Sequence, residues 1–152
     1  MKIEQDLHIH SYLSSCCSKK DEQTPGNIIS RAEQMQLTTI GFADHLWVNP
    51  SLTPSGWYSS QGETQISRLH SDLEGIHSDI RVLVGCEAEM IAPGKYGLSA
   101  AFAEGFDFVL LSCSHFHMKD FVEQPQGDTV RDLADHAMRF FRSGVRRWKK
   151  ST

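Results

Sequence analysis

Apolar residues along the chain recur with two spacings, and the two alternate. Short apolar runs, typical of buried strands, occur over residues 3–10, 39–43, 80–86 and 106–112. Elsewhere, apolar residues recur every three or four positions, which predicts helices that begin at Thr24, after the loop 47–62 and near Thr129. Thr24 and Pro25 form a typical helix start, and Asp132 lies three residues after Thr129, as a capping box requires.

This order of elements predicts an α/β fold with about four parallel strands and outer helices. The length of 152 residues suits one domain. Because four strands cannot close a barrel alone, the pattern predicts a small open sheet or half of something larger. In the last helix, Val130, Leu133 and Phe141 belong to the apolar stripe. His136 lies off that stripe, and we expect it to be solvated.

Composition excludes several classes of protein. Hydrophobic residues make up 39% of the chain, and 11 glycines bring it into the ordinary globular range, which excludes wholesale disorder. No apolar run approaches the ~18 residues of a membrane span, and the chain does not begin with a signal-peptide core. We therefore expect a cytoplasmic protein without a membrane partner, in which the four cysteines are reduced thiols.

Charge is distributed unevenly along the chain. The net formal charge is −4, but residues 1–138 carry nine basic and nineteen acidic residues, a net of −10. The last fourteen residues hold six basic and no acidic residues, and we expect a short solvated extension there. An acidic body repels a phosphate backbone unless bound cations reverse the local field, so nucleic acid is disfavoured as a partner.

Histidine and acidic residues gather at the carboxyl ends of all four predicted strands. They are His8 and His10, Asp44 and His45, Glu87 and Glu89, and His115 and His117. In parallel α/β folds this edge is where active sites are assembled, so residues far apart in the sequence lie close together there. Aromatic residues of the long loop, Trp47, Trp57 and Tyr58, either line a pocket or pack within the loop.

The two-residue spacing of these pairs suits metal binding. Because side chains alternate along a strand, His8 and His10 face the same way and can hold one cation. A carboxylate such as Glu87 can bridge two cations, which then hold both ends of an in-line displacement at phosphorus. Each pair alone is also typical of exposed polar residues at a strand end. Three strands that deliver such pairs to one edge favour a metal site.

The strand-end residues also carry a family resemblance. Five motifs occur in order: Asp6-Leu7-His8-Ile9-His10-Ser11, Thr24-Pro25, Ala43-Asp44-His45, Gly85-Cys86-Glu87 and Ser114-His115. Together they resemble the PHP (polymerase and histidinol phosphatase) family over the chain up to about Ser143. The resemblance implies a distorted (βα)7 TIM-like barrel that binds two or three divalent metal ions (Zn, Mn or Fe) and hydrolyses phosphate esters.

The resemblance also implies a role for each site residue. His8, His10 and Glu87 look like ligands of a first metal, and Glu87 would bridge to a second metal that His115 also binds. His45 looks like a ligand of a third metal. The implied catalytic residues are thus His8, His10, His45, Glu87 and His115. Many members have a histidine six residues after the second histidine of the first motif, where this chain has Cys16, a soft ligand that could serve zinc.

Two later motifs of the family, a further strand-end histidine and a final Asp-x-His, do not follow His117. The chain therefore resembles the N-terminal half of a family member. We expect a PHP domain with an incomplete barrel over 1–143 and a basic tail over 144–152. A truncated gene, a reading-frame shift near Val145 or a deliberately shortened chain would each explain this pattern.

The implied function is hydrolysis of a small phosphate monoester, as in histidinol phosphatases, by a metal-activated hydroxide. One alternative is phosphodiesterase or exonuclease activity. Another is a catalytically silent fragment that binds metal weakly. The open edges of an incomplete sheet also predict self-association.

Overall fold

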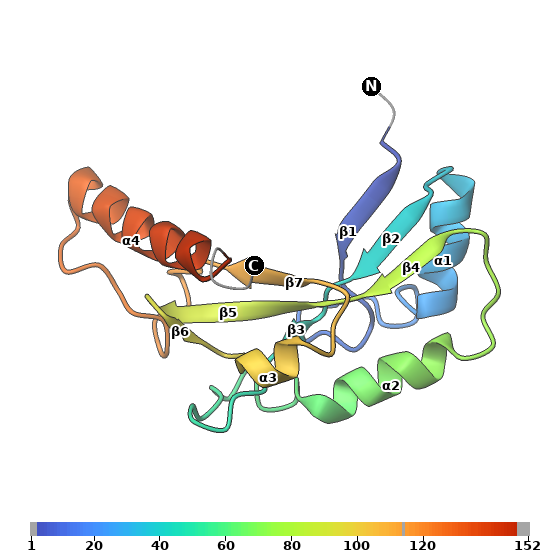
Figure 1. Cartoon of the computed structure of the whole chain (residues 1–152), viewed down its shortest axis with the longest axis horizontal. Helices are drawn as coiled ribbons and strands as arrows, with labels where there is room; N and C mark the ends of the chain where they lie inside the picture. The colour runs from blue at the N-terminus through green and yellow to red at the C-terminus, as the bar shows by residue number, and fades with distance from the viewer. Residues whose placement is uncertain (1–2, 114, 149–152) are drawn as a thin grey trace.

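The structure is a computed structural model that describes residues 3–113 and 115–148. Strands and helices alternate along most of the chain (Figure 1). In chain order they are β1 (Gln5–Ile9), α1 (Pro25–Gln34), β2 (Thr39–Phe42), β3 (His45–Leu46), α2 (Glu63–Leu73), β4 (Arg81–Val84), β5 (Cys86–Ala92), β6 (Lys95–Tyr96), α3 (Ala100–Ala103), β7 (Val109–Ser112) and α4 (Val130–Trp148). The predicted strands and helices are all present, with bounds that differ by a few residues.

Two small sheets of mainly parallel strands form the centre of the fold. One has the order β1-β2-β4, and in the other β5 pairs in parallel with β3 and β7 and antiparallel with β6. Only Ala43 and Asp44 separate β2 from β3, and only Gly85 separates β4 from β5. The Gly85 N–H donates to the carbonyl of Phe42 (2.8 Å), and the Glu87 N–H donates to that of Asp44 (3.0 Å). Two bent strands therefore carry the chain from one sheet into the other.

The α/β class with parallel strands is confirmed, whereas the barrel is not. Within residues 3–113 and 115–148 no sheet closes into a barrel, because β1 pairs only with β2 and β7 only with β5. The strand predicted over 80–86 is also corrected, since Gly85 divides it into β4 and the start of β5. Self-association through the two open edges stays a prediction.

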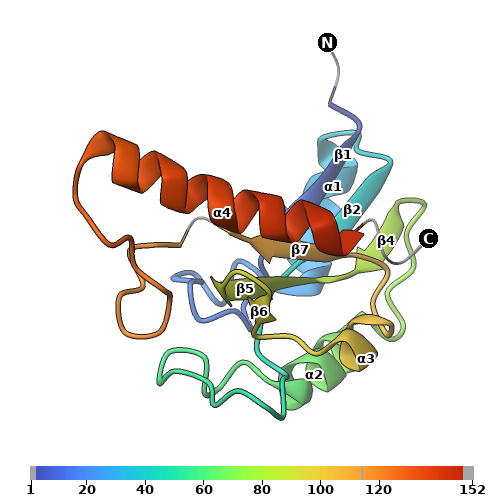
Figure 2. The same cartoon turned by 60° about the vertical axis from the view of Figure 1, so that its left-hand side comes forward.

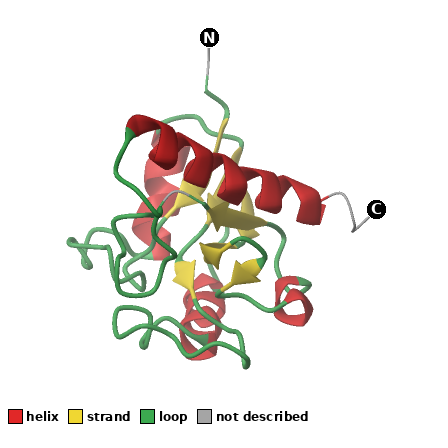
Figure 3. Ribbon diagram, turned by 90° about the vertical axis from the view of Figure 1, so that its left-hand side faces the viewer, coloured by secondary structure: helices red, strands yellow, loops and turns green. Residues whose placement is uncertain are grey.

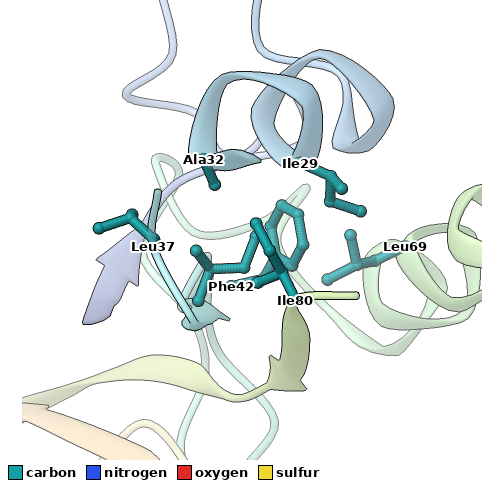
Figure 4. Close-up of a cluster of buried hydrophobic side chains, with 7 residues drawn as sticks. Ile29, Ala32, Leu37, Phe42, Leu69 and Ile80 are labelled. Carbon is teal, nitrogen blue, oxygen red and sulfur yellow. The ribbon is translucent and has the colours of Figure 1, made fainter. Parts of the chain in front are cut away.

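Helices α1 and α2 bury their apolar faces against the first sheet. Thr24 caps α1, because its side-chain oxygen accepts the backbone N–H of Asn27 at 3.3 Å. The cluster of buried side chains between these helices and the sheet is shown in Figure 4. It consists of Ile29, Ala32, Leu37, Ile40, Phe42, Leu69 and Ile80. The amphipathic spacing read from the sequence thus places both helices correctly.

Helix α4 lies along one side of the strands, with α2 on the other side (Figures 2 and 3). The predicted capping box is present, since the Thr129 hydroxyl donates to Asp132 (2.6 Å) and accepts the Asp132 N–H (3.2 Å). The helix continues to Trp148 across the predicted boundary at 143/144, while residues 149–152 lie outside the described part of the chain. The division into a domain and a basic tail stays a prediction.

The orientation of α4 differs from the prediction. Its apolar stripe faces solvent, with Val130 85% and Phe141 56% exposed, whereas His136 is only 4% exposed. The prediction of a solvated His136 is therefore wrong. His136 shares a helix face with Phe140, four residues on, and its ring packs against Phe116 while Nε2 lies 2.8 Å from the Glu123 carbonyl oxygen. No helix in the described residues is both long and apolar enough to cross a bilayer.

Candidate metal centre

Four chain segments deliver the candidate site residues to one place. His8 lies near the end of β1 and His10 directly after it, His45 begins β3, and Glu87 is the second residue of β5. His115 follows β7. In β3 and β5, His45 is the register partner of Glu87, which sets these two side chains beside each other. His8, His10 and His115 thus lie at the carboxyl ends of β1 and β7 as predicted, whereas His45 and Glu87 lie at the starts of β3 and β5, just after the bends that follow β2 and β4.

The carboxylate of Glu87 lies among four imidazoles. Its Oε2 is 3.1 Å from Nε2 of His8 and 3.2 Å from Nε2 of His10. The same oxygen is 3.4 Å from Nδ1 of His45, and Oε1 is 3.9 Å from Nε2 of His115. Glu87 and His45 are buried, whereas the side chain of His8 is 55% exposed, so the cluster is open to solvent on the side of His8.

These separations fit a divalent cation. Two ligands of a tetrahedral zinc ion, each at ~2.1 Å, lie about 3.4 Å from each other. Ligand atoms of His8, His10 and Glu87 all lie within 4.8 Å of one another. Imidazole nitrogen with carboxylate oxygen is a donor set that suits zinc, iron and manganese. The residues present are therefore suitable to hold such an ion.

Cys16 forms a second group with two of the same histidines. Its Sγ is 3.0 Å from Nδ1 of His10, and ligand atoms of His10, Cys16 and His45 also lie within 4.8 Å of one another. A neutral imidazole has one lone pair, so His10 can serve only one of the two groups at a time. With Nε2 of His10 directed at Glu87, Cys16 and His45 would remain for a separate ion.

Burial and hydrogen bonding set the protonation of this cluster for metal binding. Burial lowers the pKa of His45 to about 4, so its ring is neutral at pH 7. Burial alone would raise the pKa of Glu87, but the hydrogen bond from His10 and the other histidines around it lower it to about 2. The cluster therefore presents an ionised carboxylate and a neutral imidazole, the forms that bind cations.

Glu89 and Tyr58 complete the surroundings of the site. Glu89 is 0% exposed, and its Oε2 accepts the Tyr58 hydroxyl at 3.1 Å and lies 2.7 Å from Nδ1 of His115. The hydrogen bond with Glu89 is the main reason that the pKa of His115 is raised. The ring of Trp57 lies 4.9 Å from that of His45. Of the loop aromatics, Trp57 and Tyr58 thus line the site. The sequence indicated Glu89 only through its two-residue spacing from Glu87.

Asp44 precedes His45 and is hydrogen-bonded to Ser11, which follows His10. Its Oδ1 accepts the Ser11 N–H and its Oδ2 accepts the Ser11 hydroxyl, both at 2.6 Å. Both residues are completely buried, and burial raises the pKa of Asp44. The hydrogen bonds between Ser11 and Asp44 connect the loop after β1 to the bend between β2 and β3. They therefore hold His10, which precedes Ser11, in position relative to His45, which follows Asp44.

We expect Asp44→Ala to destabilise the fold by about 2 kcal/mol, because it leaves the buried Ser11 N–H without an acceptor. Asp44→Asn keeps that acceptor and can donate its amide to the Ser11 hydroxyl, so its loss should be smaller. Urea unfolding of both variants, with the exposed Asp120→Ala as control, measures the difference. Equal stability of Asp44→Ala and wild type would contradict the supporting role.

Comparison with known proteins agrees with the geometry. The family model for the PHP domain matches residues 6–143, which include every strand end that contributes to the cluster. No curated protein and no solved structure was found to match the chain. Since the match extends over most of its length, the chain is a member of the PHP domain family.

Proposed function

We propose that the chain hydrolyses phosphate monoesters of small molecules, as histidinol phosphatases do, with divalent metal ions held at Glu87. Membership of the PHP family indicates metal-dependent phosphoesterase activity in general. The observation that carries the proposal is one carboxylate within 4 Å of four imidazoles, which come from three separate chain segments. Divalent ions held by such a set supply a hydroxide near neutral pH and neutralise the phosphoryl oxygens.

The side chains of the cluster divide the work of holding these ions. His8 and His10 face Oε2 of Glu87 and would bind the first ion with it. His115 faces Oε1, so the two oxygens of Glu87 are directed toward different partners, as a bridging carboxylate requires. His45 and Cys16 would bind a third ion, and the thiol favours zinc or iron over manganese there. The ring of Trp57 packs edge-on against that of His45.

The two other candidate functions have less support. An exonuclease, or a phosphodiesterase that acts on nucleic acid, binds a polyanion, which the net charge of −10 over residues 1–138 would repel. The hypothesis of a silent fragment does not explain why Glu87 and the four histidines around it are already arranged as metal ligands. The monoester remains the substrate class that the site supports best.

Metal analysis together with two chromogenic substrates tests the proposal. We expect the purified chain to contain divalent metal and to hydrolyse p-nitrophenyl phosphate, with activity lost in EDTA and restored by zinc or manganese. His8→Ala should lower turnover at least about 100-fold, since it removes a metal ligand. His70→Ala, an exposed histidine on α2, should have no effect.

The alternatives give different results in the same assay. Hydrolysis of bis(p-nitrophenyl) phosphate without hydrolysis of the monoester would favour a phosphodiesterase. Substoichiometric metal with no turnover of either substrate would favour the silent fragment. Equal activity of His8→Ala and wild type would contradict a metal site at Glu87.

A further inference from the structure

We propose that Glu89 is a positioning residue that holds His115 with Nε2 directed toward the metal side of Glu87, and that Tyr58 keeps Glu89 in place. This inference rests on the proposed function, since it concerns how the second ion at Glu87 is bound. The family match assigns no role to Glu89 or Tyr58, and the Glu87-x-Glu89 spacing indicates only that Glu89 shares a strand face with Glu87.

The register of β5 and β7 brings Glu89 to His115. Glu89 is two residues beyond Glu87 on β5, so both carboxylates project to the same side of the strand. It pairs with Ser112, the last residue of β7, three residues before His115. Oε2 of Glu89 lies 2.7 Å from Nδ1 of His115.

The contact decides which nitrogen of His115 faces the cluster. With Oε2 of Glu89 as the acceptor, Nδ1 of His115 donates its proton there, and Nε2 of the neutral ring keeps its lone pair. Nε2 lies 3.9 Å from Oε1 of Glu87, a separation that a shared ion with bonds of ~2.1 Å can span. Carboxylates in this position beside ligating histidines commonly raise metal affinity.

The burial of Glu89 also points to cations. Its side chain is fully buried, and its Oε1 has no hydrogen-bond partner among the described residues. A carboxylate in this state is costly unless positive charge lies nearby. The other oxygen of Glu89, Oε2, contacts His115 and also accepts the hydrogen bond of the Tyr58 hydroxyl. That hydroxyl is 3.5 Å from Nδ1 of His45. Tyr58 therefore connects Glu89 to a second histidine of the cluster.

Glu89→Gln is the decisive variant, because glutamine preserves the size of the side chain but adds a donor. Metal uptake is measured by titration of the metal-free chain with zinc and cobalt, without any substrate. We expect the second ion to bind about 10- to 100-fold more weakly in Glu89→Gln, while the first ion at His8 and His10 is unaffected. Tyr58→Phe leaves the contact of Glu89 with His115, so its effect should be smaller. Glu104→Gln, an exposed carboxylate, is the control.

Nitrogen-15 NMR of the metal-free protein gives a second readout that depends on neither metal nor turnover. In wild type we expect the neutral His115 ring to carry its proton on Nδ1, and in Glu89→Gln the other tautomer should become populated. Unchanged tautomer and unchanged second-ion affinity in Glu89→Gln would overturn the inference. So would an equal loss of both ions with a lower melting temperature, which indicates a purely structural role. If wild type binds no ion at all, the proposed function fails, while the NMR result still decides whether Glu89 orients His115.

Discussion

Glu87→Gln is expected to remove bound metal and to lower monoester turnover by about a thousandfold or more. The carboxylate of Glu87 lies within 4 Å of His8, His10, His45 and His115, so its replacement removes a ligand that the first two ions would share. Metal activation of the nucleophile and of the phosphoryl group contributes several kcal/mol, and each ~1.4 kcal/mol corresponds to a factor of ten. Metal content and turnover are measured on the same preparation.

The pH dependence of unfolding provides an independent check on Glu87 in the metal-free chain. Its folded pKa of about 2 is below the ordinary 4.5, so ionised Glu87 stabilises the fold above pH 4.5. This contribution to the free energy of unfolding is lost as the pH falls from 4.5 toward 2. Because Glu87→Gln has no carboxylate at this position, its free energy of unfolding should not show that part of the decrease. Glu63→Gln, at the exposed start of α2, is the matched control for both measurements. Wild-type metal content in Glu87→Gln would show that the cluster is not the metal centre.

Gly85→Ala is expected to have the largest effect on stability, a loss of about 3 kcal/mol or more. A Cβ at this position would lie 2.6 Å from both the ring and the carbonyl oxygen of Phe108. The ring can move, but the carbonyl belongs to the backbone that leads into β7, so β4, β5 and β7 would have to separate. Overpacking of this kind costs 1–3 kcal/mol, occasionally more. Denaturant unfolding measures the loss.

Gly41→Ala separates the two sources of that clash. There the three atoms nearest to a Cβ would be two atoms of the Phe108 ring at 2.7 Å and the Cα of Leu7 at 3.1 Å, and none of them is backbone of Phe108. Adding Phe108→Leu should therefore rescue Gly41→Ala more than it rescues Gly85→Ala. Gly56→Ala, which has nothing within 4 Å, should stay within ~0.5 kcal/mol of wild type. Wild-type stability of Gly85→Ala would disprove the close contact with Phe108.

Much of the fold follows from the spacing of apolar residues, because that spacing reports which faces are buried. The strand-end histidines and Glu87 could be predicted as a cluster for the same reason, since parallel strands end at one edge. The break between β4 and β5 at Gly85 could not be predicted, because Val84, Gly85 and Cys86 continue one apolar run. The break depends on the approach of Phe108, which comes from a segment more than twenty residues later.

The remaining differences also arise from tertiary contacts. Helix α4 has apolar residues on two sides, and Phe116 and Val122 from the preceding loop decide that the side with Phe140 is buried. Glu89 was visible in the sequence, but its partners Tyr58 and His115 lie 31 and 26 residues away. Local patterns contain no information on such distant pairings.

The meeting of four chain segments at Glu87 has a consequence for the lifetime of the protein. An ion bound there would link β1 of the first sheet to β3, β5 and the segment after β7 of the second sheet. A ligand that binds only the folded chain at 100 times its dissociation constant stabilises it by about 2.7 kcal/mol. The trace-metal supply of its surroundings would thus govern how much of this protein persists intact.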